Sequence, residues 1–158
     1  MPSASTIDGM LPTNQRVSNA IASASQRTGV DFNYLLSQAR IESALNPNAR
    51  ASTSSATGLF QFTKQTWLGT VKEHGTQHGL GWAADAITKN SKGVYSVADQ
   101  QMRSAILNLR EDPETASFMA AEFASDNGEY LQTQLGHAPE PVDLYLAHFL
   151  GAGGAVQF

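Results

Sequence analysis

Helix start and stop signals recur along this chain, and they constrain its fold more than any other feature. Residues 14–27 place small and apolar side chains three and four positions apart, and Gly29 follows as a stop. Asp31 can cap a second helix, which Asn46-Pro47 ends. The apolar faces expected for the two helices are Val17, Ala20, Ile21 and Ala24 in the first, and Phe32, Leu35, Leu36 and Ala39 in the second.

The rest of the chain carries similar signals, separated by segments rich in small residues. The expected elements are, in order, a loop at 48–58, a short helix capped by Thr63, a loop at 73–81, a short helix near 82–89, a helix after a capping box of Ser96 and Asp99, a long helix from Asp112-Pro113 to Leu135, and a last apolar helix from Pro141.

Convincing strand alternation is missing from the sequence, and only a small hairpin fits within residues 76–95. We therefore predict one compact all-α domain of about seven helices over residues 13–158. Residues 1–12 are small and polar with two prolines, and are expected to form a flexible tail.

Composition and charge exclude several classes of function. The chain has no cysteine, so it forms neither disulfides nor thiolate metal sites and has no cysteine nucleophile. A net charge of −4 without a basic run argues against nucleic acid as a partner. His74 and His78 stand at helical spacing, but Gly75 and Gly79 interrupt them, so we expect no metal site. No apolar run is long enough to span a membrane, and the first residues do not resemble a signal peptide.

Glu42 is the strongest candidate for a catalytic residue. It lies seven residues after Leu35 and three after Ala39, so it shares their apolar stripe. Burial there would raise the pKa of its carboxyl, and the nearby helix end would act in the same direction. Such a glutamate can hold a proton near neutral pH and then release it. The alternative is a glutamate at the rim of the stripe, paired with Arg40, Arg50 or a backbone amide.

The stretch "IESALNPNA", followed by a loop of small residues, "GLFQF" and "TW", resembles the motif of the soluble lytic transglycosylases. The match is dense over residues 38–68 and weaker elsewhere. The resemblance implies a goose-type lysozyme-like helical fold. It also implies an enzyme that cleaves bacterial peptidoglycan without a cofactor. On this resemblance Glu42 corresponds to the catalytic acid and Ser43 to its neighbouring serine. Ser52 best matches the loop serine, although Ser54 competes with it because the loop is one residue longer.

The resemblance also assigns the "GLFQ" segment. The backbone near Gly58 would approach the glycan closely, and Gln61 would hydrogen-bond sugar or acetamido groups or brace the loop. Phe60 replaces the family's methionine, and for it a core role competes with stacking on sugar. The family's Ala-Tyr-Asn-Ala-Gly segment is altered here: His148 stands at the tyrosine position, and Tyr145 is three residues earlier. Either could make the polar contact to Glu42.

The resemblance implies cleavage between N-acetylmuramic acid and N-acetylglucosamine by a single glutamate, which leaves a 1,6-anhydro end. A hydrolytic lysozyme becomes the alternative if Asp126 or Glu129 approaches Glu42. A non-catalytic peptidoglycan-binding module on the same fold is a third reading. Peptidoglycan glycan strands are the expected partner, in the periplasm or after another route of export to the cell wall. A flagellum, a secretion system or phage assembly would each fit a domain of this size.

Overall fold

The computed structural model describes residues 12–136 and 140–141 of the 158. Helix α2 (Thr13–Thr28) buries the predicted face and ends at Gly29, whose φ of 80° is left-handed. Helix α3 (Phe32–Ser43) begins where Asp31 caps it, since the Asp31 carboxylate accepts a hydrogen bond from the Tyr34 amide at 2.8 Å. Both predicted helices are confirmed.

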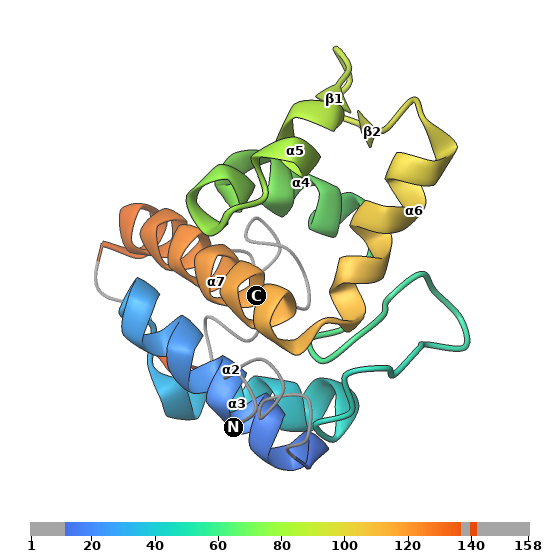
Figure 1. Cartoon of the computed structure of the whole chain (residues 1–158). Coiled ribbons are helices and arrows are strands. Elements are labelled where there is room, and N and C mark those ends of the chain that lie inside the picture. Colours follow the sequence, from blue (N-terminus) through green and yellow to red (C-terminus); the bar gives the residue numbers. More distant parts are fainter. Residues whose placement is uncertain (1–11, 137–139, 142–158) are drawn as a thin grey trace.

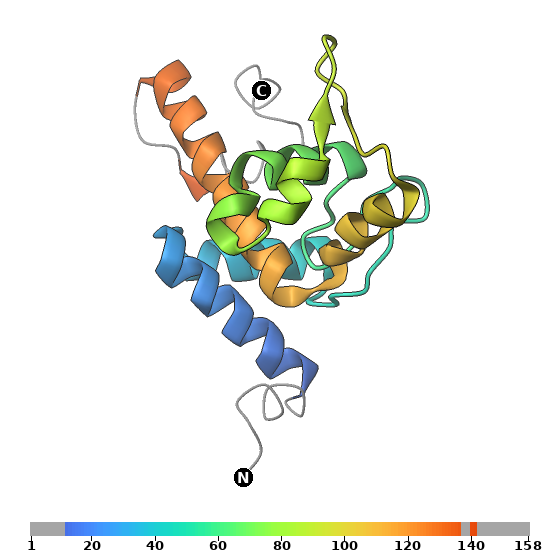
Figure 2. The same cartoon turned by 45° about the horizontal axis from the view of Figure 1, so that its top comes forward.

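A long loop leads from α3 to the next group of short elements. Helix α4 (Lys64–His74) is capped by Thr63, as expected. A 3-10 turn η1 (Gly75–His78) and helix α5 (Gly81–Ala86) follow. Strands β1 (Thr88–Lys89) and β2 (Tyr95–Ser96) form a small antiparallel hairpin. The hairpin projects beyond α5, away from α2 (Figure 2).

The chain then returns through two helices. Helix α6 (Gln100–Asn108) leads into a 3-10 turn η2 (Leu109–Glu111). The long helix α7 (Pro113–Leu135) begins at the Asp112 cap and ends at Gly136, as the sequence predicts. The described residues thus contain six α-helices and one two-stranded sheet. The predicted all-α class, with a small hairpin, is confirmed.

Helix α7 lies at the centre, between α2 and α3 on one side and α4 and α5 on the other (Figure 1). The core forms where these layers meet, and Trp67 of α4 is its largest buried side chain. The indole of Trp67 donates a hydrogen bond to the Ile106 carbonyl at 2.8 Å, which ties α4 to α6. A buried aromatic ring with a satisfied N–H fixes the position of α4 relative to α6.

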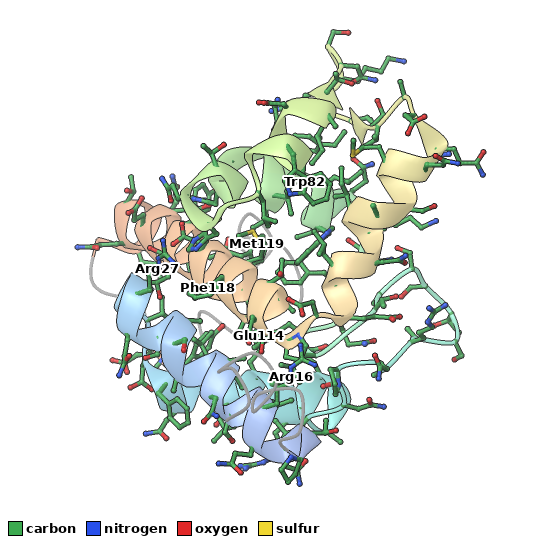
Figure 3. The ribbon with its side chains drawn as sticks, in the orientation of Figure 1. Arg16, Arg27, Trp82, Glu114, Phe118 and Met119 are labelled. Atoms are coloured by element: carbon green, nitrogen blue, oxygen red, sulfur yellow. The ribbon has the colours of Figure 1, made fainter. Side chains whose placement is uncertain are left out.

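Two arginines join α2 to the first turns of α7, one near each end of α2. Arg16 of α2 donates to the carboxylates of Asp112 and Glu114 at the start of α7. Near the other end, the Arg27 guanidinium lies 5.6 Å from the centre of the Phe118 ring. Figure 3 shows both pairs, together with Met119 pointing from α7 into the core. These contacts set the register of α2 along α7.

Three expectations about boundaries were wrong. The predicted loop at 73–81 is partly helical, because α4 continues to His74 and η1 follows. The predicted capping box is replaced by Asp99 alone, which accepts from the Met102 amide at 2.8 Å, while Ser96 belongs to β2. Helix α3 ends at Ser43, before Asn46-Pro47, because Ala44 takes a left-handed conformation.

Other expectations lie at the ends of the chain. The predicted tail, apart from Pro12, and the last apolar helix beyond Pro141 lie outside the described residues. None of the helices within the described ranges has the length and hydropathy needed to cross a membrane.

Candidate active site

Glu42 lies in the last turn of α3, at the point where the buried stripe of that helix reaches the surface. Leu35 and Ala39 are fully buried, whereas Glu42 is half-buried. Burial raises the pKa of the Glu42 carboxyl above its ordinary value. The carbonyl end of the helix disfavours its negative charge as well. Glu42 is therefore a carboxyl that keeps its proton more readily than a glutamate in water, yet is still open to solvent.

Tyr34 and Gln38 precede Glu42 by two turns and one turn on the same face of α3. Both are buried, and their side-chain polar atoms have no hydrogen-bond partner among the described residues. Burial raises the pKa of Tyr34, and so does the negative charge of Glu42. The sequence analysis missed both residues, although the helical spacing that singled out Glu42 also reaches them.

A groove of about 440 Å³ follows this part of α3. Tyr34, Gln38 and Ile41 line it, and Ile41 is 64% exposed. The other residues that line the groove are Asp31, Asn33, Ser37 and Pro141. Most of the lining residues are therefore polar. Glu42 is not one of the lining residues; it follows Ile41, the last residue of α3 that lines the groove.

The α3 terminus turns sharply into the following loop. Ala44 and Leu45 have φ values of 53° and 64°, a region that residues other than glycine rarely adopt. Their amides donate to the Arg40 and Ala39 carbonyls at 2.9 and 3.3 Å, which closes the helix end. This tight turn fixes the backbone directly after Glu42.

Ser43 joins the helix end to the "GLFQ" segment. Its hydroxyl lies 2.7 Å from the Leu59 carbonyl oxygen and 2.9 Å from that of Ala39. The hydroxyl has one proton, so it donates to one of these two carbonyls at a time or shares the proton between them. In this structure Ser43 holds Leu59 beside the turn that carries Glu42.

The loop serines lie at the surface. Ser52 and Ser54 are both exposed, and the Ser54 hydroxyl accepts a hydrogen bond from the Ala56 amide at 3.2 Å. No hydrogen bond links Ser52 to another described residue. The choice between the two serines as a glycan contact therefore stays a prediction.

The "GLFQ" residues serve the loop itself. Gly58 has a φ of 89°, and a Cβ there would lie 2.0 Å from the Arg110 carbonyl oxygen, so only glycine fits. Phe60 is fully buried, so its ring has no surface to offer a sugar in this conformation. The Gln61 amide donates to the Gly58 and Ala49 carbonyls at 2.9 and 3.1 Å. The loop-bracing contact considered for Gln61 is thus present.

Arg110 of η2 contacts the loop between α3 and α4, and the sequence analysis missed it. It is 7% exposed, and one of its guanidinium nitrogens donates to the Ser55 and Phe62 carbonyls at 2.7 and 3.0 Å. Its Nε donates to the Leu107 carbonyl at 3.0 Å. In the sequence Arg110 stands next to Glu111 and Asp112, which predicts a solvated charged turn. No local signal indicates that its side chain points inward.

The remaining charged candidates lie elsewhere or belong to other contacts. Arg50 pairs with Glu111 at 2.9 Å rather than with Glu42. Asp126 accepts a hydrogen bond from His74 at 2.6 Å, and Glu129 is exposed. Tyr145 and His148 lie outside the described residues.

Among the described residues, Glu73, His74 and Asp126 have ligand atoms close enough to hold a metal ion, all within 4.8 Å of one another. Glu122 lies 2.9 Å from the other ring nitrogen of His74. A protonated His74 between these carboxylates accounts for the cluster without an ion, because each ring nitrogen then has an acceptor.

Residues 19–81 match the family model described as the transglycosylase SLT domain. The match includes Glu42, Ser43 and the "GLFQ" segment, and it agrees with the resemblance found in the sequence. It ends before α6, η2 and α7, so Arg110 lies outside it.

Proposed function

We propose that the protein is a lytic transglycosylase that acts on peptidoglycan with Glu42 as its single acid and base. The match of residues 19–81 to the model of the transglycosylase SLT domain supports this proposal. The bond cleaved is the β-1,4 bond between N-acetylmuramic acid and N-acetylglucosamine. One observation carries the assignment: Glu42 is half-buried at the end of α3, and burial raises the pKa of its carboxyl. A group that must first give a proton near neutral pH needs such a shift.

The proposed reaction leaves Glu42 in the protonation state in which it began, because the proton it gives to one oxygen is replaced by a proton from another. Protonated Glu42 donates to the glycosidic oxygen, the bond from that oxygen to C1 breaks, and the leaving sugar departs with a 4-hydroxyl. The Glu42 carboxylate then takes the proton of the muramic acid 6-hydroxyl as this oxygen bonds to C1. The products are a 1,6-anhydro end and a protonated Glu42, and no water is consumed.

A hydrolytic lysozyme is the second candidate, because glycosidases that use water commonly have a second carboxylate near the acid. Asp126 already accepts a hydrogen bond from His74, and Glu129 is exposed on α7. These contacts favour the single-carboxylate scheme. A non-catalytic glycan-binding module is the third candidate, but half-burying a carboxyl that has no ion pair within residues 12–136 would have little use in a binder.

Digestion of purified sacculi, with the products read by mass, tests all three candidates. We expect 1,6-anhydro-muropeptides from the native protein. Glu42→Gln should lower the rate by a factor of about 10²–10⁴, since the amide keeps the shape but cannot deliver a proton. Glu73→Gln changes an exposed glutamate of α4 that has no role in any of the three candidates; it is the matched control and should keep full activity. Reducing ends would indicate a hydrolase, and absence of cleavage with retained glycan binding would indicate a binder.

The substrate implies a place of action. Peptidoglycan lies outside the cytoplasmic membrane, so the protein would act in the periplasm or at the cell wall. Local opening of the wall for a flagellum, a secretion system or a phage is the type of task that we propose for it. This location is tested by cross-linking cells, isolating the cell-wall fraction and measuring whether the protein is recovered with it.

A further inference from the structure

Arg110 is a buried cation beside the loop that joins α3 to α4. We infer that Arg110 is a positioning residue: its guanidinium holds residues 50–62 in the conformation that binds the glycan strand next to Glu42. This inference rests on the proposed function for its catalytic consequence, but the loop conformation can be measured without any activity.

The guanidinium connects two points that lie seven residues apart in the loop. It donates to the carbonyl of Ser55 at 2.7 Å and to that of Phe62 at 3.0 Å. Its Nε bonds the Leu107 carbonyl at 3.0 Å, which fixes the side chain to the end of α6. The two ends of the segment that contains Gly58 and Gln61 are therefore attached to the α6–α7 side of the molecule.

The backbone of Arg110 shapes the same segment. The Arg110 carbonyl oxygen occupies the place where a Cβ of residue 58 would be, at 2.0 Å. The loop backbone thus packs directly against η2 at Gly58. Arg110 acts twice, through its side chain on Ser55 and Phe62 and through its main chain on Gly58.

Contacts on the far side of the segment lead to Glu42. The Ser43 hydroxyl bonds the Leu59 carbonyl, and Ser43 follows Glu42 directly. Residues 57–62 are therefore held between Arg110 on one side and the end of α3 on the other. Loss of the Arg110 contacts would free one side of this segment, while Glu42 would keep its own anchor on α3.

Arginine suits this position better than lysine. A guanidinium offers five N–H groups in a rigid plane and stays charged when buried, whereas a lysine ammonium is a point donor on a flexible stem. All the hydrogen-bond acceptors of Arg110 in the described ranges are backbone carbonyls, which do not titrate. Burial lowers the pKa of Arg110, but the ordinary pKa of arginine is so high that the guanidinium stays charged near neutral pH. The contact therefore does not depend on a titration near neutral pH.

Hydrogen exchange on the full chain tests the positioning role directly. In Arg110→Met we expect the amides of Thr57 and Gly58 to exchange at least about tenfold faster, since they bond the Phe62 and Ala49 carbonyls within this loop. Exchange in α2 and α7 should stay near the native rate. Arg50→Met is the matched control, because Arg50 lies in the same loop but is exposed and pairs with Glu111. Arg110→Lys should give an intermediate rate and serves as the test if Arg110→Met does not fold.

Kinetics on solubilised glycan strands give a second measurement. A loosened binding loop should raise KM about tenfold and change kcat less, while the pH profile set by Glu42 stays unchanged. A purely structural loss would lower the folded fraction, and so lower kcat at an unchanged KM. That second pattern, or exchange that rises equally in α2 and α7, would overturn the inference.

The two proposals fail in different ways. If the native protein yields no muropeptides, the proposed function fails, and glycan-binding affinity replaces KM as the measurement for Arg110. If the native protein cleaves sacculi but Arg110→Met and Arg110→Lys both exchange like Arg50→Met in residues 50–62, only the role of Arg110 is refuted.

Discussion

Two cations tie separate parts of this molecule together, and their environments differ in kind. Arg110 is buried and bonds neutral backbone carbonyls around the loop of the candidate active site. His74, at the end of α4, lies between the carboxylates of Glu122 and Asp126 on α7. The Arg110 contact should be independent of pH, whereas the His74 contact depends on a proton. The loop proposed to bind substrate is thus held by the contact that does not titrate.

The two regions also differ in how much space they leave. Around Arg110 the backbone is packed so closely that a Cβ on Gly58 would collide with it. The His74 cluster is more open, since the Asp126 and Glu73 side chains are 41% and 60% exposed. Substitutions should therefore cost more beside Arg110 than in the His74 cluster.

Gly58→Ala is the substitution with the largest expected effect on stability. It combines a left-handed φ of 89° with a Cβ that would lie 2.0 Å from the Arg110 carbonyl oxygen. We expect the free energy of unfolding to fall by about 3 kcal/mol or more, measured by urea denaturation. Gly29→Ala is the control, because its φ is 80° but no atom lies within 4 Å of the added Cβ, and it should cost about 1 kcal/mol. Equal losses would show that the packing against Arg110 is loose.

His74→Gln should have a smaller effect, and one that depends on pH. Burial alone lowers the pKa of His74, but the hydrogen bond to Asp126 and the charges of Asp126, Glu122 and Glu73 raise it above its ordinary value. We expect the free energy of unfolding to fall by about 1–2 kcal/mol at pH 6. The loss is no larger because solvent weakens the ion pairs with the exposed carboxylates.

The sign of the pH dependence follows from the raised pKa. Folded His74 binds its proton more tightly than unfolded His74, so its contribution is complete below the unfolded pKa and is lost as pH rises through the folded pKa. The facing groups are Glu73 on α4, Glu122 and Asp126 on α7, and His78 of η1, whose pKa burial lowers. The stability difference between the native protein and His74→Gln should therefore shrink from pH 6 to pH 9. A constant difference would contradict the charged-histidine interpretation.

The sequence predicted most of the helices because their signals are local. The caps at Asp31, Thr63 and Asp112 and the stops at Gly29 and Gly136 all act within one helical turn, so spacing alone places them. The apolar face of α2 was likewise predicted residue by residue. The η1 turn was missed because three glycines indicate a loop unless tertiary contacts favour a 3-10 conformation.

The candidate site was less accessible to prediction. Glu42 was identified from helical spacing, which also fixes where it points. Arg110 could not be identified in this way, because its carbonyl partners at Ser55 and Phe62 are 55 and 48 residues away in sequence. Backbone carbonyls are present at every position, so no residue type marks them as partners of a buried arginine.

Glu42→Gln should raise stability slightly at neutral pH, in contrast to His74→Gln. The folded pKa of Glu42 is raised by burial, so the folded state is penalised as pH rises from the unfolded pKa through the folded one. Removing the charge removes this penalty. Because solvent screens a half-buried carboxyl, we expect only a small gain of about 0.5–1 kcal/mol at pH 7 and none near pH 4. Thermal unfolding at both values checks it. A loss at pH 7 would mean that the Glu42 carboxylate has a stabilising partner.

Arg50→Met should have the smallest effect on stability. It tests whether exposed charge near η2 contributes to holding the loop, in addition to the buried hydrogen bonds of Arg110. Arg50 pairs with Glu111, next to Arg110, yet 72% of its side chain is exposed. An exposed ion pair gains little in water, so we expect a loss of less than about 0.5 kcal/mol, and a smaller one at 0.5 M salt. Urea denaturation at low and high salt measures both values. A loss as large as that of Arg110→Met would mean that charge near η2, rather than the buried hydrogen bonds of Arg110, holds the loop.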